Sequence, residues 1–260
     1  MALQATIKQT RAPTWEPAPR ILELSPGEVH LWRGRLSLKK DEVAELWPRL
    51  SEKEQTRASR FHFPEDSDRY ILTRGMLRDI LLRYQTLVAT PLRISVRPTG
   101  QPYVLQSPDG PGMRFNLSHS RSLVLFAITL DRKVGIDVEP VSNGTDWQTI
   151  ANRFFSAREC QYLLALPTPE REQAFLSLWT RKEAYVKAKG EGLSIPLDSF
   201  SILASPDGTL RVDDTADLTA RRAWSFLNLT PDEHHLGAVA MEGHPSHVLF
   251  WDSNFVHSVT

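Results

Sequence analysis

The chain has 260 residues, a length that suits one large domain or two modest ones. Hydrophobic residues make up 41% and charged residues 24%, ordinary globular proportions that exclude a disordered, collagenous or coiled-coil chain. Lysine plus arginine number 31, as do aspartate plus glutamate, and this zero net charge argues against a partner such as nucleic acid or an anionic membrane.

The N-terminal residues and the cysteine content predict a cytoplasmic protein. Residues 1–18 carry no continuous apolar run of the signal-peptide kind, and we expect them to form a loosely packed arm. No apolar run approaches the roughly 18 residues of a membrane span. Cys160 is the single cysteine, so no intrachain disulfide can form, which fits a reducing compartment.

Helix signals come first in the chain, and strand signals follow them. Ser51 followed by Glu54 predicts a capping box that opens a short helix. Apolar residues at helical spacing predict a longer helix over residues 66–84. Short apolar or β-branched runs predict strands at residues 92–96, 113–117, 123–130 and 134–138, with a tight turn at 131–133.

The second part of the chain repeats this order. Ser156 and Glu159 predict another capping box. Thr168 followed by Pro169 predicts the N-cap and first residue of a long helix, which ends before Gly190. Strands are expected at residues 199–203, 210–212, 223–229, 236–241 and 248–251.

The order of helices, strands, helices and strands predicts an α+β fold rather than one doubly wound sheet. Short echoes favour two similar halves, because residues 59–61 resemble 152–154, and residues 115–117 resemble 227–229. After the arm at residues 1–18, we therefore expect an N-terminal half at residues 19–132 and a C-terminal half at residues 133–260.

Two carboxylates share one face of a predicted strand. Residues two apart on a strand point the same way, so Asp137 and Glu139 lie together while Ile136 and Val138 enter the core. Their repulsion at close range costs roughly 3–4 kcal/mol at an effective dielectric near 20. A cation such as Mg²⁺ would relieve it. The alternative is a solvated edge strand with two acidic side chains.

A second set of candidate residues lies on the long predicted helix. Trp179, Glu183 and Lys187 are four residues apart and so share one face. They are interpreted either as a surface Glu–Lys pair beside a packed tryptophan, or as a functional set. In the functional case Glu183 is a metal ligand or base, and Lys187 reaches a phosphate.

Anion-binding candidates lie at the end of a predicted strand. Asn116, Ser118, His119 and Ser120 can present donors to an anion, or can form an ordinary polar turn. A Gly-x-Ser-x-Gly elbow, Cys/His spacing for zinc and a Gly-rich phosphate loop are all missing from the sequence. A phosphate would thus be held by side chains, with basic candidates at Arg57, Arg60, Arg69 and Arg74 that otherwise are solvated arginines.

In order and identity, these segments resemble the 4′-phosphopantetheinyl transferases of the surfactin-synthetase-activator (Sfp) type. The resemblance extends from about Leu46 to Leu210. It rests on residues 115–120, 135–139, 153–156, 179–187 and 189–193.

The resemblance implies an activity and an architecture. The phosphopantetheine arm of coenzyme A would be transferred to a serine of an apo acyl or peptidyl carrier protein, with release of 3′,5′-ADP. The enzyme would be a monomer with its active site in the cleft between two similar α+β halves. Asp137, Glu139 and Glu183 would bind Mg²⁺ or Mn²⁺, with Glu183 as general base and Lys187 at the pyrophosphate. Coenzyme A contacts are implied for Arg57, Arg69, Gly100, Gln101, Pro102, Asn116, Ser118, His119 and Lys187.

One residue departs from the family pattern. The family commonly has Gly-Lys-Pro where this chain has Gly100, Gln101 and Pro102. Gln101 carries no charge, so we expect weaker binding of coenzyme A unless Arg97 or another basic side chain compensates.

The segment after the long helix is a candidate carrier-docking surface. Residues 190–203 hold several apolar side chains, and Arg181, Lys187 and Lys189 would supply positive charge for an acidic carrier helix. The alternative is a buried connection between helix and strand.

Two other functions stay open on the sequence alone. An Asp-x-Glu strand with a Glu and a Lys on a helix also suits a metal-dependent phosphodiesterase or nuclease, although zero net charge disfavours a nuclease. A non-catalytic, carrier-binding adaptor is disfavoured because Asp137, Glu139, Glu183 and Lys187 are all intact.

Overall fold

The structure is a computed structural model that describes residues 13–89, 91–105, 112–141, 144, 146–214 and 223–253. Its larger sheet has the strand order β1 (Glu16–Pro17), β12 (His247–Asp252), β2 (Glu28–Arg35), β6 (Leu123–Leu130) and β5 (Met113–Ser120). A smaller sheet has the order β10 (Trp224–Asp232), β11 (His235–Glu242) and β7 (Val134–Pro140). Two hairpins pair β3 (Ile94–Val96) with β4 (Pro102–Val104), and β8 (Phe200–Ala204) with β9 (Leu210–Asp214).

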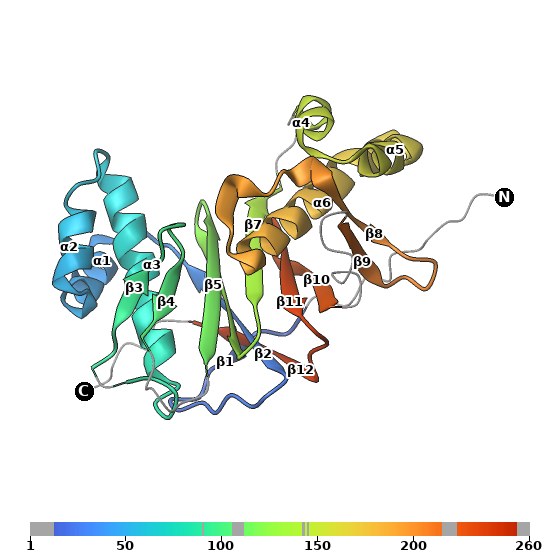
Figure 1. Cartoon of the computed structure of the whole chain (residues 1–260). Helices are drawn as coiled ribbons and strands as arrows, with labels where there is room; N and C mark the ends of the chain where they lie inside the picture. The colour runs from blue at the N-terminus through green and yellow to red at the C-terminus, as the bar shows by residue number, and fades with distance from the viewer. Residues whose placement is uncertain are drawn as a thin grey trace.

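The helices gather at the two ends of the molecule, with the two larger sheets between them (Figure 1). One end holds α1 (Lys40–Leu46), the 3₁₀ turn η1 (Trp47–Arg49), α2 (Glu52–Ala58) and α3 (Pro64–Leu82). The other holds α4 (Trp147–Phe154), α5 (Ala157–Ala165) and α6 (Thr168–Lys189), followed by the 3₁₀ turns η2 (Gly192–Ser194) and η3 (Leu197–Ser199). The predicted α+β class is confirmed. None of the described helices combines the length and apolarity needed to cross a bilayer.

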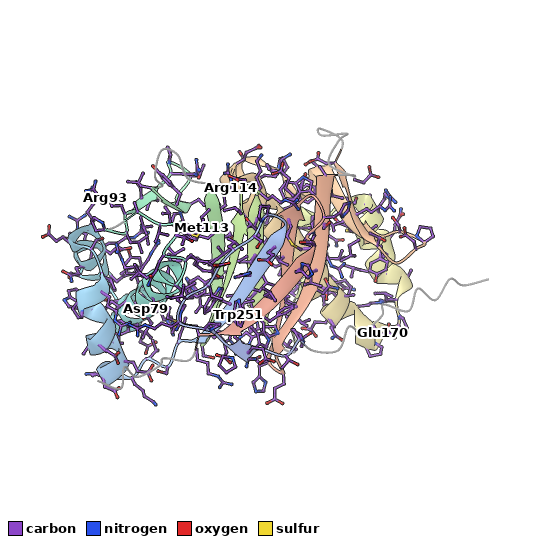
Figure 2. All side chains as sticks on the ribbon, turned by 90° about the horizontal axis from the view of Figure 1, so that it is seen from below. Asp79, Arg93, Met113, Arg114, Glu170 and Trp251 are labelled. Atoms are coloured by element: carbon purple, nitrogen blue, oxygen red, sulfur yellow. The ribbon has the colours of Figure 1, made fainter. Side chains whose placement is uncertain are left out.

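The last strand joins the sheet of the first half. β12 pairs in parallel with β2, where Trp251 faces Trp32, and Trp251 lies in the middle of the molecule (Figure 2). Residues 247–252, part of the predicted C-terminal half, therefore form a strand of the larger sheet between β1 and β2. The division at residues 132 and 133 stays a prediction.

Part of the predicted N-terminal arm is packed rather than loose. β1 pairs with β12, and the Trp15 ring meets Phe250 edge-on with centroids 5.3 Å apart. The Arg33 guanidinium lies 5.2 Å from the centre of the Trp15 ring. Residues 13–18 are thus held by strand pairing and aromatic contacts. These contacts involve residues far along the chain, so neighbouring residues in the sequence do not predict them. Residues 1–12 lie outside the described residues.

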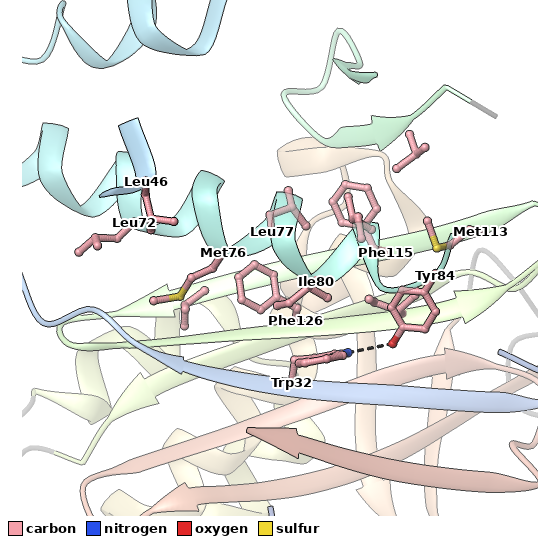
Figure 3. Close-up of a cluster of buried hydrophobic side chains, with 14 of the residues drawn as sticks. Trp32, Leu46, Leu72, Met76, Leu77, Ile80, Tyr84, Met113, Phe115 and Phe126 are labelled. Carbon is pink, nitrogen blue, oxygen red and sulfur yellow. Dashed lines mark hydrogen bonds between the residues drawn. The ribbon is translucent and has the colours of Figure 1, made fainter. Parts of the chain in front are cut away.

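Helix α3 covers one face of the larger sheet. Leu72, Met76, Leu77 and Ile80 are fully buried and pack toward Trp32 of β2 and Phe126 of β6 (Figure 3). Each such side chain contributes about 1.5–3 kcal/mol by leaving water. The dashed line in Figure 3 is the hydrogen bond that Trp32 Nε1 donates to the Tyr84 hydroxyl at 3.0 Å.

The opposite face of the larger sheet packs on the smaller sheet. Leu123, Leu125 and Ala127 of β6 share a core with Ile136 and Val138 of β7. The far face of the smaller sheet carries α6, through a further core that includes Tyr185, Ala188 and Ala238. The layers are therefore α3, larger sheet, smaller sheet and α6. The predicted inward direction of Ile136 and Val138 is confirmed.

Local signals in the sequence predict several helix ends correctly, whereas most strand ends are shifted by one or more residues. Both predicted capping boxes form, at Ser51 and at Ser156. α6 ends at Gly190, which adopts φ 75°, as predicted. Its N-cap is Pro167 rather than the predicted Thr168, because Pro169 occupies the second helical position, where its missing N–H is equally harmless.

Candidate active site

A cavity of about 410 Å³ opens where β5, β7 and α6 meet. It draws on both predicted halves, since β5 belongs to the first and β7 and α6 to the second. Its lining comprises Leu117, Ser118, His119, Asp137, Val138, Glu139, Trp179, Glu183 and Lys187. The structure thus gathers six of the predicted site residues in one place.

β5 and β7 are held side by side by side-chain hydrogen bonds. The Ile136 N–H donates to Asn116 Oδ1 at 3.1 Å, and Ser118 Oγ donates to Asp137 Oδ1 at 2.9 Å. Asn116 is buried, and this bond occupies its amide oxygen. The predicted donor strand is therefore fixed directly beside the predicted acidic strand.

Gly135 allows α6 to rest directly on β7. A Cβ atom at this position would lie 2.0 Å from the Ala184 carbonyl oxygen and 2.5 Å from the Ala188 nitrogen. With no side chain there, the helix backbone approaches the strand backbone. Glu183 and Lys187 consequently reach the cavity that Asp137 and Glu139 line.

Asp137 is the most enclosed acid of the cavity. Lys187 Nζ donates to Asp137 Oδ1 at 2.6 Å and to Ser118 Oγ at 3.0 Å. The second carboxylate oxygen, Oδ2, is buried and has no hydrogen-bond partner among the described residues. An orphaned buried carboxylate oxygen is a position that a bound cation would satisfy.

The other two acids are held in a setting that disfavours their charge. Burial raises the pKa of Glu139, the charge of Asp137 raises it further, and Lys187 and a hydrogen bond from Trp179 oppose the shift. Burial and the Asp137 charge likewise raise the pKa of Glu183, against the effect of Lys187. A divalent cation would offset both effects.

The donor set fits Mg²⁺ or Mn²⁺. Three carboxylates face one cavity, and Mg²⁺ in proteins binds through one or two carboxylates together with phosphate oxygens and water. In the described ranges, no three His, Cys, Asp or Glu side chains already form a closed ligand cluster. Phosphate oxygens and water would therefore supply the remaining ligands.

His119 stands at the same cavity as a neutral donor. Burial lowers its pKa, and the charges of Lys187 and Arg69 lower it further. A neutral imidazole can donate a hydrogen bond to a phosphate oxygen. Arg69 itself is engaged with Asp66 at 3.1 Å and with Glu65 at 3.4 Å.

A second cavity of about 300 Å³ adjoins the first, and the two share Leu117 and Lys187. It brings in the predicted coenzyme contacts Gly100, Gln101, Pro102 and Asn116, together with Arg74, Thr99, Gly190 and Gly192. The Gln101 amide donates to the Lys187 carbonyl at 3.4 Å.

The predicted Arg57 and Arg69 line neither cavity. Arg57 and Arg74 each lie 5.5 Å from the Tyr70 ring centre, so Arg57 is linked to the second cavity through that ring. Arg97 lies over the Tyr103 ring at 5.0 Å. Among the lining residues, Thr99 carries no sequence signal that marks it as functional, and Gly192 lies in a segment of the family resemblance but is not among the predicted coenzyme contacts.

The predicted positive docking patch loses Arg181, and the docking surface itself stays a prediction. Arg181 is only 5% exposed and donates to Asn228 Oδ1 at 2.8 Å. Lys187 is paired with Asp137, and Lys189 Nζ lies 3.8 Å from Asp214. Ile195 and Leu197 pack partly buried against the core under α6, as the alternative of a buried connection predicted.

Comparison with known proteins identifies the family. Residues 133–240 match the model of the 4′-phosphopantetheinyl transferase superfamily, and residues 37–130 match an N-terminal 4′-phosphopantetheinyl transferase model. The 4′-phosphopantetheinyl transferase HetI of Nostoc sp. is 37% identical over 92% of this chain and 98% of its own. The chain belongs to the 4′-phosphopantetheinyl transferase superfamily.

Two relatives from Bacillus subtilis are also named 4′-phosphopantetheinyl transferases. The transferase ffp is 35% identical over 68% of this chain and 76% of its own, and Sfp is 35% identical over 63% and 70%. The predicted resemblance to Sfp-type transferases is therefore confirmed. The two family matches meet between residues 130 and 133, which supports two similar halves.

Proposed function

We propose that this transferase moves the 4′-phosphopantetheine arm of coenzyme A to a serine of an apo acyl or peptidyl carrier protein and releases 3′,5′-ADP. The observation that carries the proposal is the convergence of Asp137, Glu139, Glu183 and Lys187 at one cavity, beside donors from β5. Membership of the superfamily supports the same activity.

Asp137, Glu139 and Glu183 would hold Mg²⁺ or Mn²⁺. The orphaned Oδ2 of Asp137 and the raised pKa values of Glu139 and Glu183 support this assignment. When bound, the cation offsets negative charge that develops on the departing phosphate.

Lys187, Ser118 and His119 would bind the pyrophosphate of coenzyme A. The Lys187 ammonium stabilises charge on the leaving oxygen. Burial and the charges of Lys187 and Arg69 lower the pKa of His119, which favours the neutral imidazole, and a ring N–H would donate a hydrogen bond to a phosphate oxygen. Ser118 stands between Lys187 and Asp137, which orients both of these groups toward the cavity.

Glu183 would act as the general base. The oxygen of the carrier serine forms a bond to the β-phosphorus of coenzyme A, and the bond from that phosphorus to the bridging oxygen breaks. The serine proton passes to Glu183, and the bridging oxygen leaves with 3′,5′-ADP. Glu183 lines the same cavity as Lys187 and the donors of β5, which places a carboxylate where the serine proton would be released.

Coenzyme A would extend from the first cavity into the second. Gly100, Gln101 and Pro102 line that second cavity beside Arg74, with Arg57 behind the Tyr70 ring. Gln101 supplies an amide where relatives commonly supply a lysine charge, so replacing Gln101 by Lys should tighten binding of coenzyme A. An unchanged affinity would contradict that role.

The first experiment is intact-protein mass spectrometry of an apo carrier protein incubated with this chain, coenzyme A and MgCl₂. A gain of one phosphopantetheine arm that is lost with a chelator is expected. Glu183→Gln should slow transfer by about 10²–10⁴-fold while coenzyme A still binds. The control is Glu170→Gln, an exposed acid at the opposite end of α6.

Each other outcome has a definite meaning. Near wild-type transfer by Glu183→Gln would contradict its role as base. Binding of coenzyme A without transfer to either fatty-acid or peptide carriers would favour the adaptor. Cleavage of a phosphodiester without a carrier would favour the phosphodiesterase. We further propose that the enzyme is cytoplasmic, which the single cysteine supports, and that it is a monomer, as the resemblance to Sfp-type transferases implies.

A further inference from the structure

The Lys187 ammonium already pairs with one carboxylate oxygen of Asp137, the acid that the cation would bind. Its Nζ atom lies 2.6 Å from Asp137 Oδ1 and 3.0 Å from Ser118 Oγ. Among the described residues that line the first cavity, Lys187 is the one lysine or arginine, against three carboxylates. In the free protein it thus offsets the charge of Asp137, whose side chain is only 5% exposed.

A cation at Asp137 and the Lys187 ammonium repel each other. Both are drawn to the same buried carboxylate, so either one weakens the hold of the other. A divalent cation that binds alone must displace Lys187 or bind beside it. Either route costs affinity that a site with a free Asp137 would keep.

The Lys187 ammonium has a second possible position, in the neighbouring cavity. Lys187 lies in the last turn of α6, its side chain is 30% exposed, and it lines both cavities. Its ammonium can therefore turn away from Asp137 while the helix stays in place. Lys182 on the same helix is the contrast, because it is fully buried between Glu159 and the Phe200 carbonyl.

We propose that Lys187 is the resident counter-ion of Asp137, and that the pyrophosphate of coenzyme A draws it away and opens Asp137 to the divalent cation. The inference rests on the proposed function, because that function places the pyrophosphate beside Lys187. It follows that coenzyme A and the cation tighten each other's binding, and that Lys187 carries part of this coupling.

The test measures Mn²⁺ binding directly, as free Mn²⁺ by electron paramagnetic resonance with MnCl₂ as the probe. Titrations are made with and without coenzyme A. In the absence of coenzyme A, Lys187→Met should bind Mn²⁺ at least about fivefold more tightly than the wild type. Coenzyme A should then improve Mn²⁺ affinity by a smaller factor in Lys187→Met than in the wild type.

The matched control is Lys189→Met. It removes the same charge from the same helix turn, but Lys189 lies beside Asp214 rather than Asp137. Its Mn²⁺ affinity should stay close to that of the wild type. If Lys187→Met binds Mn²⁺ no more tightly than the wild type, or if Lys189→Met gains as much, the counter-ion role is overturned.

A second substitution tests the proposal if Lys187→Met does not fold. A Lys187→Met protein that folds only with MnCl₂ present supports the proposal, because the cation then replaces the missing ammonium. If it does not fold at all, Ser118→Ala removes one hydrogen bond that seats Lys187 and keeps the charge. A smaller gain in Mn²⁺ affinity is expected there, and no gain overturns the proposal.

The two proposals fail in different ways. If the wild type neither binds coenzyme A nor modifies a carrier, the proposed function fails. If it does both and Lys187→Met shows no tighter binding of Mn²⁺, only the counter-ion exchange fails.

Discussion

The two long helices occupy equivalent outer layers but bury different chemistry. α3 buries mainly apolar side chains, including Leu72, Leu77 and Ile80, against the larger sheet. α6 buries Thr180, Arg181 and Lys182 among its apolar residues and brings Glu183 and Lys187 to the cavity. The α3 layer is an ordinary apolar core, whereas the α6 layer has ionisable groups at some of its buried positions.

Glycines show how the two helix contacts differ. At Gly34 of β2, an added Cβ would meet the Met76 sulfur of α3 at 2.7 Å, which is the movable part of a flexible side chain. At Gly135 of β7, the same atom would meet the backbone of α6. Side chains therefore separate helix from strand in the first half, whereas backbones touch in the second. The site depends on that shorter separation.

The largest combined effect, on stability and on transfer together, is expected from Gly135→Ala. The added methyl group must push α6 away from β7, because the Ala184 carbonyl and the Ala188 nitrogen cannot turn aside. We expect a loss of about 3 kcal/mol or more in the free energy of unfolding, together with loss of transfer. Gly34→Ala is the matched control, and we expect about 1 kcal/mol there because Met76 can change rotamer. Urea denaturation of both variants measures the difference, and equal costs would refute the comparison.

A second large effect is expected from Lys182→Met. Lys182 Nζ donates to Glu159 Oε2 and to the Phe200 carbonyl, both at 2.6 Å, and both side chains of the ion pair are fully buried. Removing one partner leaves a buried charge, which typically costs about 3–5 kcal/mol. Lys53→Met, on the exposed surface of α2, is the control. Urea denaturation should separate the two variants, and a cost below about 1 kcal/mol for Lys182→Met would contradict the structure.

Glu159 explains why this pair is worth testing. It caps α5 through Ser156, accepts the Ile202 N–H at 2.9 Å and binds Lys182, so it ties α5, α6 and β8 together. The double variant Glu159→Gln with Lys182→Met leaves no buried charge at this position. It should recover part of the stability that Lys182→Met loses.

Features that depend on neighbouring residues could be predicted from the sequence. The capping boxes at Ser51 and Ser156 are local hydrogen bonds, and the end of α6 at Gly190 needs only one left-handed residue. The strand over residues 123–130 matches β6 because every residue in it except Thr129 is apolar. The gathering of Asp137, Glu183 and Lys187 followed from the family resemblance rather than from their spacing.

Features that depend on distant partners could not be predicted. Strand β2 carries charged residues at both ends that conceal its buried middle, and its pairing with β12 joins distant parts of the chain. Arg181 looks like a surface charge because its partner, Asn228, lies 47 residues away. The pairing of Lys187 with Asp137 likewise needs β7 and α6 to be in contact.

The smallest effect concerns Glu183, where function and stability oppose each other. Because its pKa in the folded protein is raised above the ordinary value of 4.5, the folded protein holds this proton more tightly than the unfolded chain does. The folded state therefore loses stability as the pH rises from 4.5 through the higher folded pKa. Glutamine stays neutral and avoids that loss, so metal-free Glu183→Gln should exceed the wild type in stability at pH 7.5 by on the order of 1 kcal/mol.

The pH dependence and the cation then separate the causes. The advantage of Glu183→Gln should vanish as the pH falls below 4.5, where Glu183 is protonated in both the folded and the unfolded states. It should also shrink when MgCl₂ is added at pH 7.5, because a bound cation favours the ionised carboxylate. Thermal unfolding across this pH range measures both changes, with Glu170→Gln as a variant that should follow the wild type. A Glu183→Gln protein that is less stable than the wild type at pH 7.5 without metal would show that the Glu183 carboxylate stabilises the fold. The ionisable groups of α6 would then not reduce the stability of the second half.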